Sequence, residues 1–120
     1  MGMSGNHPQT RVFVYGSLLN SERRRQILGR EVRILPARLD GYERGRGRYF
    51  YIVPRAGAET AGAILLGLDA RDLAALDRYE ELPNLYTRET VTVSTNGGGR
   101  ITCWCYLPTA RALSERARNR

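Results

Sequence analysis

Two short segments of this 120-residue chain hold residues whose types could do chemistry. The first is the turn Tyr15-Gly16-Ser17-Leu18, in which glycine allows successive backbone N–H groups to hold an anion or a developing oxyanion. The second is Glu80, whose carboxylate can take up and give back a proton. Since many strand-to-helix connections need glycine for steric reasons, the turn alone is a weak indication. The two segments together predict an active site, provided that the fold brings them together.

The composition excludes several other kinds of active site. The only histidine is His7, in a polar N-terminal segment, so neither a Ser-His-Asp triad nor a Cys-His pair is expected. The absence of lysine excludes a phosphate-binding loop of the Walker type. Cys103 and Cys105 project from the same face of a strand, so a disulfide between them would be strained. With no second cysteine pair, no metal site is expected, and both thiols are predicted to pack in the core.

The chain is strongly basic, with a formal net charge of +7, and all 19 basic residues are arginine. Positive charge favours nucleic acid or another anionic partner, because basic side chains neutralise backbone phosphates regardless of the base sequence. Several of the arginines, however, lie in the terminal segment 109–120, where charges are usually solvated. The glycine-rich segment Gly41–Arg48 has too few Arg-Gly dipeptides for an RNA-binding tract and is expected to be a loop. Nucleic acid therefore remains an alternative partner and is not favoured.

The length of the chain is that of a single domain. Hydrophobic residues make up 42%, close to the globular norm, and no stretch approaches the roughly 20 apolar residues needed to cross a bilayer. Residues 1–10 are small and polar, unlike a secretory signal, and are expected to be a disordered tail. Residues 11–108 are expected to form the domain, and 109–120 an Arg-rich tail or a short helix. These features predict a soluble, cytoplasmic protein that does not bind membranes.

The first half of the chain is expected to be mostly strands. The β-branched and aromatic run Arg11–Tyr15 predicts a strand, followed by a helix that Asn20 or Ser21 caps and that Gly29 ends. Further strands are expected over 31–39, with Pro36 at an edge or bulge, over 49–53, which Pro54 ends, and over 61–68, which is apolar enough to be buried on both faces. A loop is expected over 55–60.

The second half places Glu80 on a helix. Asp69 is the expected N-cap, with Asp72 three residues later as a weak capping box, and the helix should run to Arg78 or Tyr79. Its apolar stripe should carry Glu80 inward, whereas Glu81, about 100° further round, should meet solvent. Pro83 should end the helix. Strands over 86–94 and 101–107 should then form a hairpin, with Asn96-Gly97-Gly98-Gly99 as its turn.

Three motifs, taken in order, resemble the γ-glutamyl cyclotransferase family. They are VFVYGSLL at 12–19, GLDARDLAALDRYE at 67–80 and LYTRETVTV at 85–93. The chain is most similar to short members, akin to the γ-glutamylamine cyclotransferases and the plant avirulence-induced proteins, and the resemblance spans residues 12–107. It implies an α+β fold, in which a mixed, mostly antiparallel sheet closes into a small β-barrel flanked by two main helices. The site is expected at the open end of this barrel.

The resemblance also implies a reaction. The α-amine of a γ-glutamyl amine or small peptide attacks its own γ-carbonyl, which gives 5-oxoproline and releases an amine or amino acid, and no cofactor is required. Carried over residue by residue, Tyr15, Gly16, Ser17 and Leu18 bind the γ-glutamyl moiety and Glu80 is the catalytic acid and base. Family members often have glycine after this glutamate, where the present chain has Glu81. The resemblance defines neither the leaving amine nor the oligomeric state.

Other interpretations of these residues remain open at the level of sequence. The chain could be a binding module of the same fold without turnover, or an Arg-rich nucleic-acid binder. Ser17 could serve through its hydroxyl or only through its N–H, and Tyr15 could be a wall of the pocket. Tyr86 and Arg88 could bind the substrate carboxylate or only pack within their strand.

Overall fold

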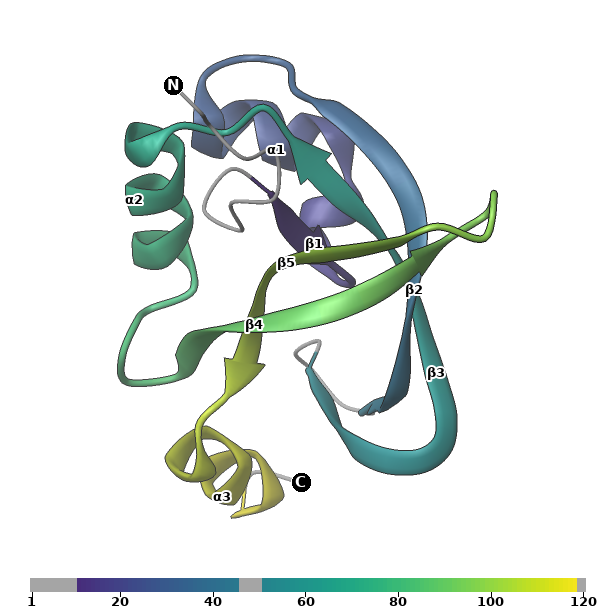
Figure 1. Ribbon diagram of the computed structural model, residues 1–120. Coiled ribbons are helices and arrows are strands. Elements are labelled where there is room, and N and C mark those ends of the chain that lie inside the picture. Colours follow the sequence, from purple (N-terminus) through teal and green to yellow (C-terminus); the bar gives the residue numbers. More distant parts are fainter. Residues whose placement is uncertain (1–10, 46–50, 119–120) are drawn as a thin grey trace.

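A closed five-stranded β-barrel forms the centre of the molecule (Figure 1). The computed structural model describes residues 11–45 and 51–118. Around the barrel the strands follow the order β1, β3, β2, β4, β5, and only the closing pair of β1 and β5 is parallel. The strands are β1 (Val12–Val14), β2 (Arg33–Arg44), β3 (Ile52–Leu66), β4 (Tyr86–Thr95) and β5 (Arg100–Pro108). The expected α+β fold with a mixed, mostly antiparallel barrel is confirmed.

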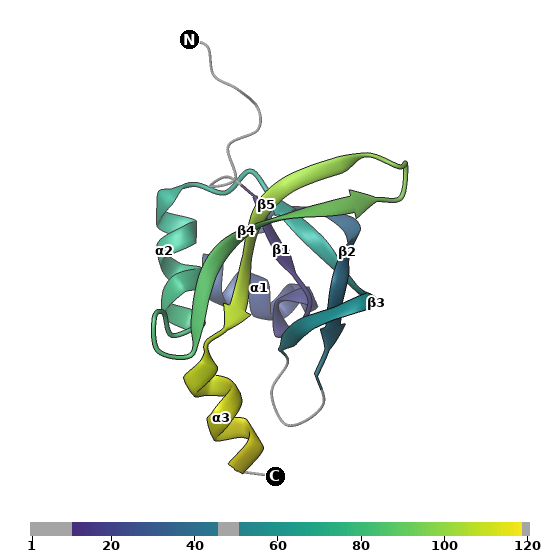
Figure 2. The same ribbon diagram turned by 60° about the horizontal axis from the view of Figure 1, so that its bottom comes forward.

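Three α-helices accompany the barrel: α1 (Ser21–Leu28), α2 (Ala70–Tyr79) and α3 (Ala110–Arg118). Helices α1 and α2 contact each other beside the barrel, and α3 extends from the end of β5, away from the tip of the β4–β5 hairpin (Figure 2). The expected cap is confirmed, since the side chain of Asn20 accepts from the N–H of Arg23 at 2.8 Å. Gly29 ends α1 in the left-handed region, with φ of 75°. Among the described residues, no helix is long and apolar enough to span a bilayer.

Side chains alternate between two hydrophobic layers along the strands, as the period of a β-strand requires. Inside the barrel, Phe13 packs with Ile64 and the two cysteines. On the outer face, Val12 and Val14 pack with residues that include Leu73 and Leu76 of α2. The apolar run that was expected to be buried on both faces therefore supplies both layers, with Ala63, Ile64 and Leu65 at its centre.

The β2–β3 hairpin is longer than the sequence suggests. The expected loop over 55–60 is wrong and the one over 41–48 is wrong in part, because β2 continues to Arg44 and β3 runs from Ile52 to Leu66. Pro54 pairs with Tyr42 despite the low strand propensity of proline, and the register shifts between Asp40 and Tyr42, whose partners are Glu59 and Pro54. The remainder of the expected loop, 46–48, and residues 49–50 of the expected strand lie outside the described residues.

Strands β2 and β4 pair through a short contact. Only two residue pairs join these strands, Ala37 with Thr95 and Arg38 with Ser94. We refer to this contact as the β2–β4 seam. Beyond it, the β2–β3 and β4–β5 hairpins continue, each within its own ladder.

One expectation about a helix end is wrong, and one about the C-terminal segment is resolved. Pro83 does not end α2, because the helix stops at Tyr79 and Pro83 follows in a turn, after a cis peptide bond with Leu82. The C-terminal segment, which was expected to be a tail or a short helix, forms α3, and Thr109 bonds to the N–H of Ala112 at its start. The expected disordered tail 1–10 lies outside the described residues.

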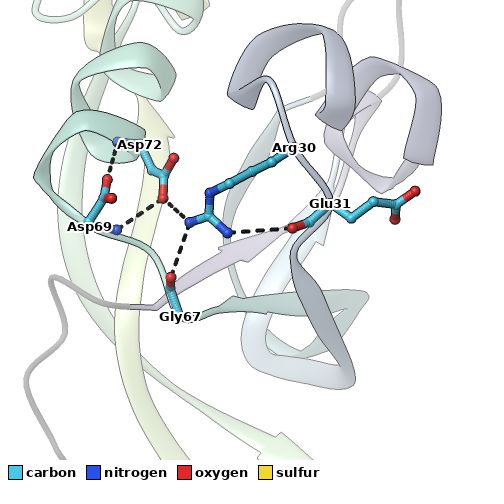
Figure 3. Close-up of polar contacts among 5 residues, drawn as sticks. All are labelled: Arg30, Glu31, Gly67, Asp69 and Asp72. Carbon is cyan, nitrogen blue, oxygen red and sulfur yellow. Dashed lines mark hydrogen bonds and ion pairs between the residues drawn. The ribbon is translucent and has the colours of Figure 1, made fainter.

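Arg30 ties the exit of α1 to the start of α2 (Figure 3). Its guanidinium donates to the carbonyl of Gly67 at 3.2 Å and to the buried carboxylate of Asp72. Asp72 also completes the capping box with Asp69, in which each side chain accepts from the other residue's N–H, at 2.8 and 3.0 Å. These contacts fix the N-terminus of α2, and through it the direction in which the helix carries Glu80.

We predict that Gly62→Ala destabilises the barrel. A Cβ at this position would lie 2.2 Å from the carbonyl oxygen of Val14 and 2.8 Å from the ring of Phe13, so β1 and β3 would have to separate. The expected loss, read from urea unfolding, is on the order of 1–3 kcal/mol. Gly97→Ala is the control, because its Cβ would meet nothing within 4 Å. Equal stability of the two variants would contradict the close approach.

A second prediction concerns the thiols inside the barrel. Burial raises the pKa of Cys103 from 9.0 to about 11 and also raises the pKa of Cys105. A folded-state pKa above the unfolded value gives stability that is complete below about pH 9 and is lost as the pH rises towards about 11. We expect the free energy of unfolding, measured under reducing conditions, to fall across this range, and to fall less steeply in Cys103→Ala. Parallel curves would argue against thiol ionisation as a cause.

Candidate active site

The glycine turn directly follows β1 at one end of the barrel. Gly16 precedes the short 3-10 helix η2 (Ser17–Leu19), whose turns are closed by N–H groups of Leu19 and Asn20 at 2.9 and 3.1 Å. The first N–H groups of a helical turn have no acceptor within it. The turn can therefore offer the amides of Ser17 and Leu18 to an oxygen of a substrate.

The residues that flank the turn hold it in place. Tyr15 is buried within the barrel, and its hydroxyl donates to the carbonyl of Tyr106 on β5 at 2.8 Å. Leu18 is buried in the layer between the barrel and the helices. The turn is thus anchored on both sides, which favours Tyr15 as a wall of the site.

Arg24 of α1 supports the turn, a role that no pattern in the sequence indicated. Its guanidinium donates to the carbonyls of Leu18 and Leu19 at 3.0 and 2.9 Å, and only 9% of the residue is exposed. Carbonyls at the end of a short helix need such donors when they are away from water. Arginine is most often a surface residue, so its type alone did not suggest burial.

Glu80 lies at the C-terminal end of α2. Its N–H donates to the carbonyl of Leu76 at 2.9 Å, so its backbone still belongs to the last turn of the helix. The residue is half-buried, whereas Glu81 is exposed, as the helical spacing predicts. Glu81 also adopts a left-handed conformation, with φ of 59°. This is the position at which family members often have glycine, a residue that adopts such a conformation without steric cost.

The charge of Glu80 acts on β5. Burial is the main reason why the pKa of the Cys105 thiol and that of the Tyr106 phenol are raised, and the Glu80 carboxylate contributes to both shifts. The main-chain carbonyl of Tyr106 also accepts the hydroxyl of Tyr15, so the start of the glycine turn is bonded to the same strand.

The glycine turn and the end of α2 are in direct contact. The hydroxyls of Ser17 and Tyr79, which are 62 positions apart in the sequence, lie 2.6 Å from each other. Tyr79 immediately precedes Glu80, and Ser17 is the third residue of the turn. The structure therefore brings together the two segments that the sequence singled out.

Asp77 and Arg88 form a second connection between α2 and the barrel. The carboxylate of Asp77 accepts from the hydroxyl of Tyr106 at 2.6 Å and pairs with Nε of Arg88 at 3.1 Å. The guanidinium of Arg88 also lies over the ring of Trp104, 4.6 Å from its centre. Tyr86 is buried in the layer between barrel and helices. These contacts favour the packing role for Tyr86 and Arg88 over binding of a substrate carboxylate.

The fold described above is that of a known family. A family model described as "Gamma-glutamyl cyclotransferase, AIG2-like" matches residues 12–119. The chain therefore belongs to the γ-glutamyl cyclotransferase, AIG2-like family, as the resemblance of its motifs implied.

Three similar proteins illustrate this membership. The first is a Methanocaldococcus jannaschii protein that is named as a gamma-glutamylcyclotransferase and, as an unproven assignment, an RNase. It is 30% identical over 99 residues, which make up 80% of this chain and 45% of that protein. AIG2-like protein D of Arabidopsis thaliana is 35% identical over 94 residues, 76% of this chain and 60% of that protein. A solution structure of another Arabidopsis thaliana protein superposes with a TM-score of 0.77 at 31% identity, covering 89% of this chain and 73% of that one. The chain thus spans about half of the length of the curated relatives.

We predict that Glu81→Gly stabilises the protein. Glycine removes the steric cost of the left-handed conformation at the end of α2, and the side chain that is lost is exposed. The expected gain in the free energy of unfolding is roughly 1 kcal/mol. Glu81→Ala is the matched control, because alanine removes the carboxylate but keeps Cβ and the steric cost. A gain of the same size in both variants would point to the charge of Glu81 instead of its backbone.

Proposed function

We propose that the protein is a γ-glutamyl cyclotransferase that releases 5-oxoproline from a γ-glutamyl amine or small peptide. The observation that carries this proposal is the 2.6 Å contact between Ser17 and Tyr79, which puts the glycine turn beside the helix end that bears Glu80. Membership of the family supports the same class of reaction. The proposed substrate is a small molecule, the reaction uses no cofactor, and a cytoplasmic location stays a prediction.

In the proposed reaction Glu80 moves protons. Its carboxylate takes a proton from the α-ammonium group of the substrate, which frees the amine to attack the γ-carbonyl carbon. A new C–N bond closes the five-membered ring, and the carbonyl becomes a tetrahedral oxyanion. Glu80 then gives that proton to the leaving nitrogen as the original amide bond breaks. The second proton of the attacking nitrogen passes to the released amine, which leaves as an ammonium group, so the carboxylate of Glu80 is regenerated. A positioned acid and base of this kind contributes roughly 10²–10⁴ in rate.

In the proposed reaction the glycine turn stabilises the oxyanion and binds the substrate. The amides of Ser17 and Leu18 donate to the oxyanion, and one such donor is typically worth roughly 10²–10³ in rate. Tyr15 and Gly16 complete the surface that holds the γ-glutamyl moiety. Holding the substrate in a folded conformation also lowers the entropic cost of ring closure, a contribution that can be large.

Two other functions are less well supported. A binding module without turnover would not need an ionisable side chain beside the amides of the turn, and Glu80 supplies one. Nucleic-acid binding would rest on free arginines, but several of the described ones pair with carboxylates, as Arg25 does with Glu31, Arg38 with Glu59 and Arg55 with Glu43. We therefore favour catalysis on a small molecule.

We predict that Glu80→Gln loses at least about a hundredfold in turnover, because glutamine cannot exchange protons at the required step. The measurement is release of 5-oxoproline from a panel of γ-glutamyl amines and dipeptides, with folding checked by circular dichroism. Glu81→Gln is the matched control, and its exposed side chain should be dispensable.

Each result has a definite meaning. Full activity of Glu80→Gln would transfer the acid and base role to another residue. Loss of activity in Glu81→Gln alone would exchange the roles of the two neighbouring carboxylates. Absence of 5-oxoproline with every compound, together with substrate binding by the parent protein, would favour the binding module.

A further inference from the structure

The hydroxyl contact between Ser17 and Tyr79 joins the two halves of the candidate site. It is short, at 2.6 Å, and either oxygen can be the donor. Both hydroxyls are close in the chain to a proposed functional group. Ser17 also carries one of the main-chain amides of the turn, and Tyr79 directly precedes Glu80. A fixed distance between these two oxygens therefore restricts the distance between the amides and the carboxylate.

Tyr79 is itself held on more than one side. Its ring packs against the hydrophobic layer between the barrel and the helices. The guanidinium of Arg23 on α1 lies 6.0 Å from the centre of the ring. A tyrosine that is held along its ring presents its hydroxyl in one direction, and Ser17 lies at that point.

The last turn of α2 is also hydrogen-bonded to the barrel. Asp77, two residues before Tyr79, accepts the hydroxyl of Tyr106 from β5. The helix end therefore cannot turn about its axis without breaking one of these hydroxyl contacts. Asp77 bonds to the barrel wall, whereas Tyr79 bonds to the glycine turn.

We propose that Tyr79 is a positioning residue, which holds the glycine turn at a fixed distance from Glu80 by binding the hydroxyl of Ser17. Under this proposal, which rests on the proposed function, the side chain of Ser17 is a brace and the turn acts on the substrate through its main-chain amides. The sequence left open whether the hydroxyl or the N–H of Ser17 serves the substrate, and the contact with Tyr79 favours the N–H.

A double-mutant cycle tests the brace. Tyr79→Phe keeps the ring and removes its hydroxyl, and Ser17→Ala removes the other partner. Each variant should lose about five- to tenfold in kcat, with a similar loss in kcat/KM, because the interaction lost aligns groups used in the transition state. The double variant should lose no more than either single variant, since both remove the same contact.

Amide hydrogen exchange measures the same brace without turnover. The N–H groups of Leu19 and Asn20 donate to the carbonyls of Gly16 and Ser17, so their exchange reports on the order of the turn. Both single variants should exchange these amides about five- to tenfold faster than the parent protein. Thr95→Val is the control, because it removes a hydroxyl contact to Gly99 within the β4–β5 hairpin and should change neither exchange nor turnover.

Three results would overturn the proposal. A much larger loss in Ser17→Ala than in Tyr79→Phe, with multiplying effects in the double variant, would assign the hydroxyl of Ser17 to the substrate. Unchanged exchange and turnover in Tyr79→Phe would show that the turn holds its position alone. Faster exchange with unchanged kcat would reduce the contact to a stabilising one. If the parent protein releases no 5-oxoproline, the proposed function fails, and unchanged exchange in Tyr79→Phe still decides against the brace.

Discussion

The packing of α2 on the outer face of the barrel is the contact on which the candidate site depends. Leu73 and Leu76 are buried there, and each such side chain contributes about 1.5–3 kcal/mol relative to exposure. Their burial also selects the rotation of the helix about its axis. If the helix buried a stripe shifted by one residue, every side chain would turn by about 100°. Tyr79 would then miss the glycine turn, and Asp77 would miss β5. Burial of apolar surface therefore decides where the polar groups of the last turn lie.

Features that depend on local chemistry could be predicted from the sequence. The cap at Asn20 and the left-handed Gly29 follow from side-chain and backbone preferences that act within one turn of helix. The same holds for the capping box that begins at Asp69. The difference in burial between Glu80 and Glu81 was expected from helical spacing, although Glu81 lies beyond the helix in a left-handed conformation. The closed barrel was not worked out from such patterns, and its prediction came from the resemblance of three motifs to a family.

Features that depend on long-range contacts could not be predicted. Pro54 suggested the end of a strand, but it pairs with Tyr42 of β2 and lies within β3. No pattern in the sequence indicates which arginine will be buried, because the burial of Arg24 depends on carbonyls that the fold brings to it. The contact between Ser17 and Tyr79 is of the same kind. Two hydroxyls distant in the chain meet only after the helix and the barrel have packed, so the sequence could name the two segments but not the atoms that join them.

The β2–β4 seam has a consequence for how this scaffold can change. Because two residue pairs join β2 to β4, most of each hairpin is paired within its own ladder. Residues can therefore be inserted or exchanged along one hairpin without disturbing the pairing of the other. The contact between the glycine turn after β1 and the end of α2 would remain in place. Over evolutionary time, the hairpins could thus change in length and sequence while the two segments of the candidate site stay together.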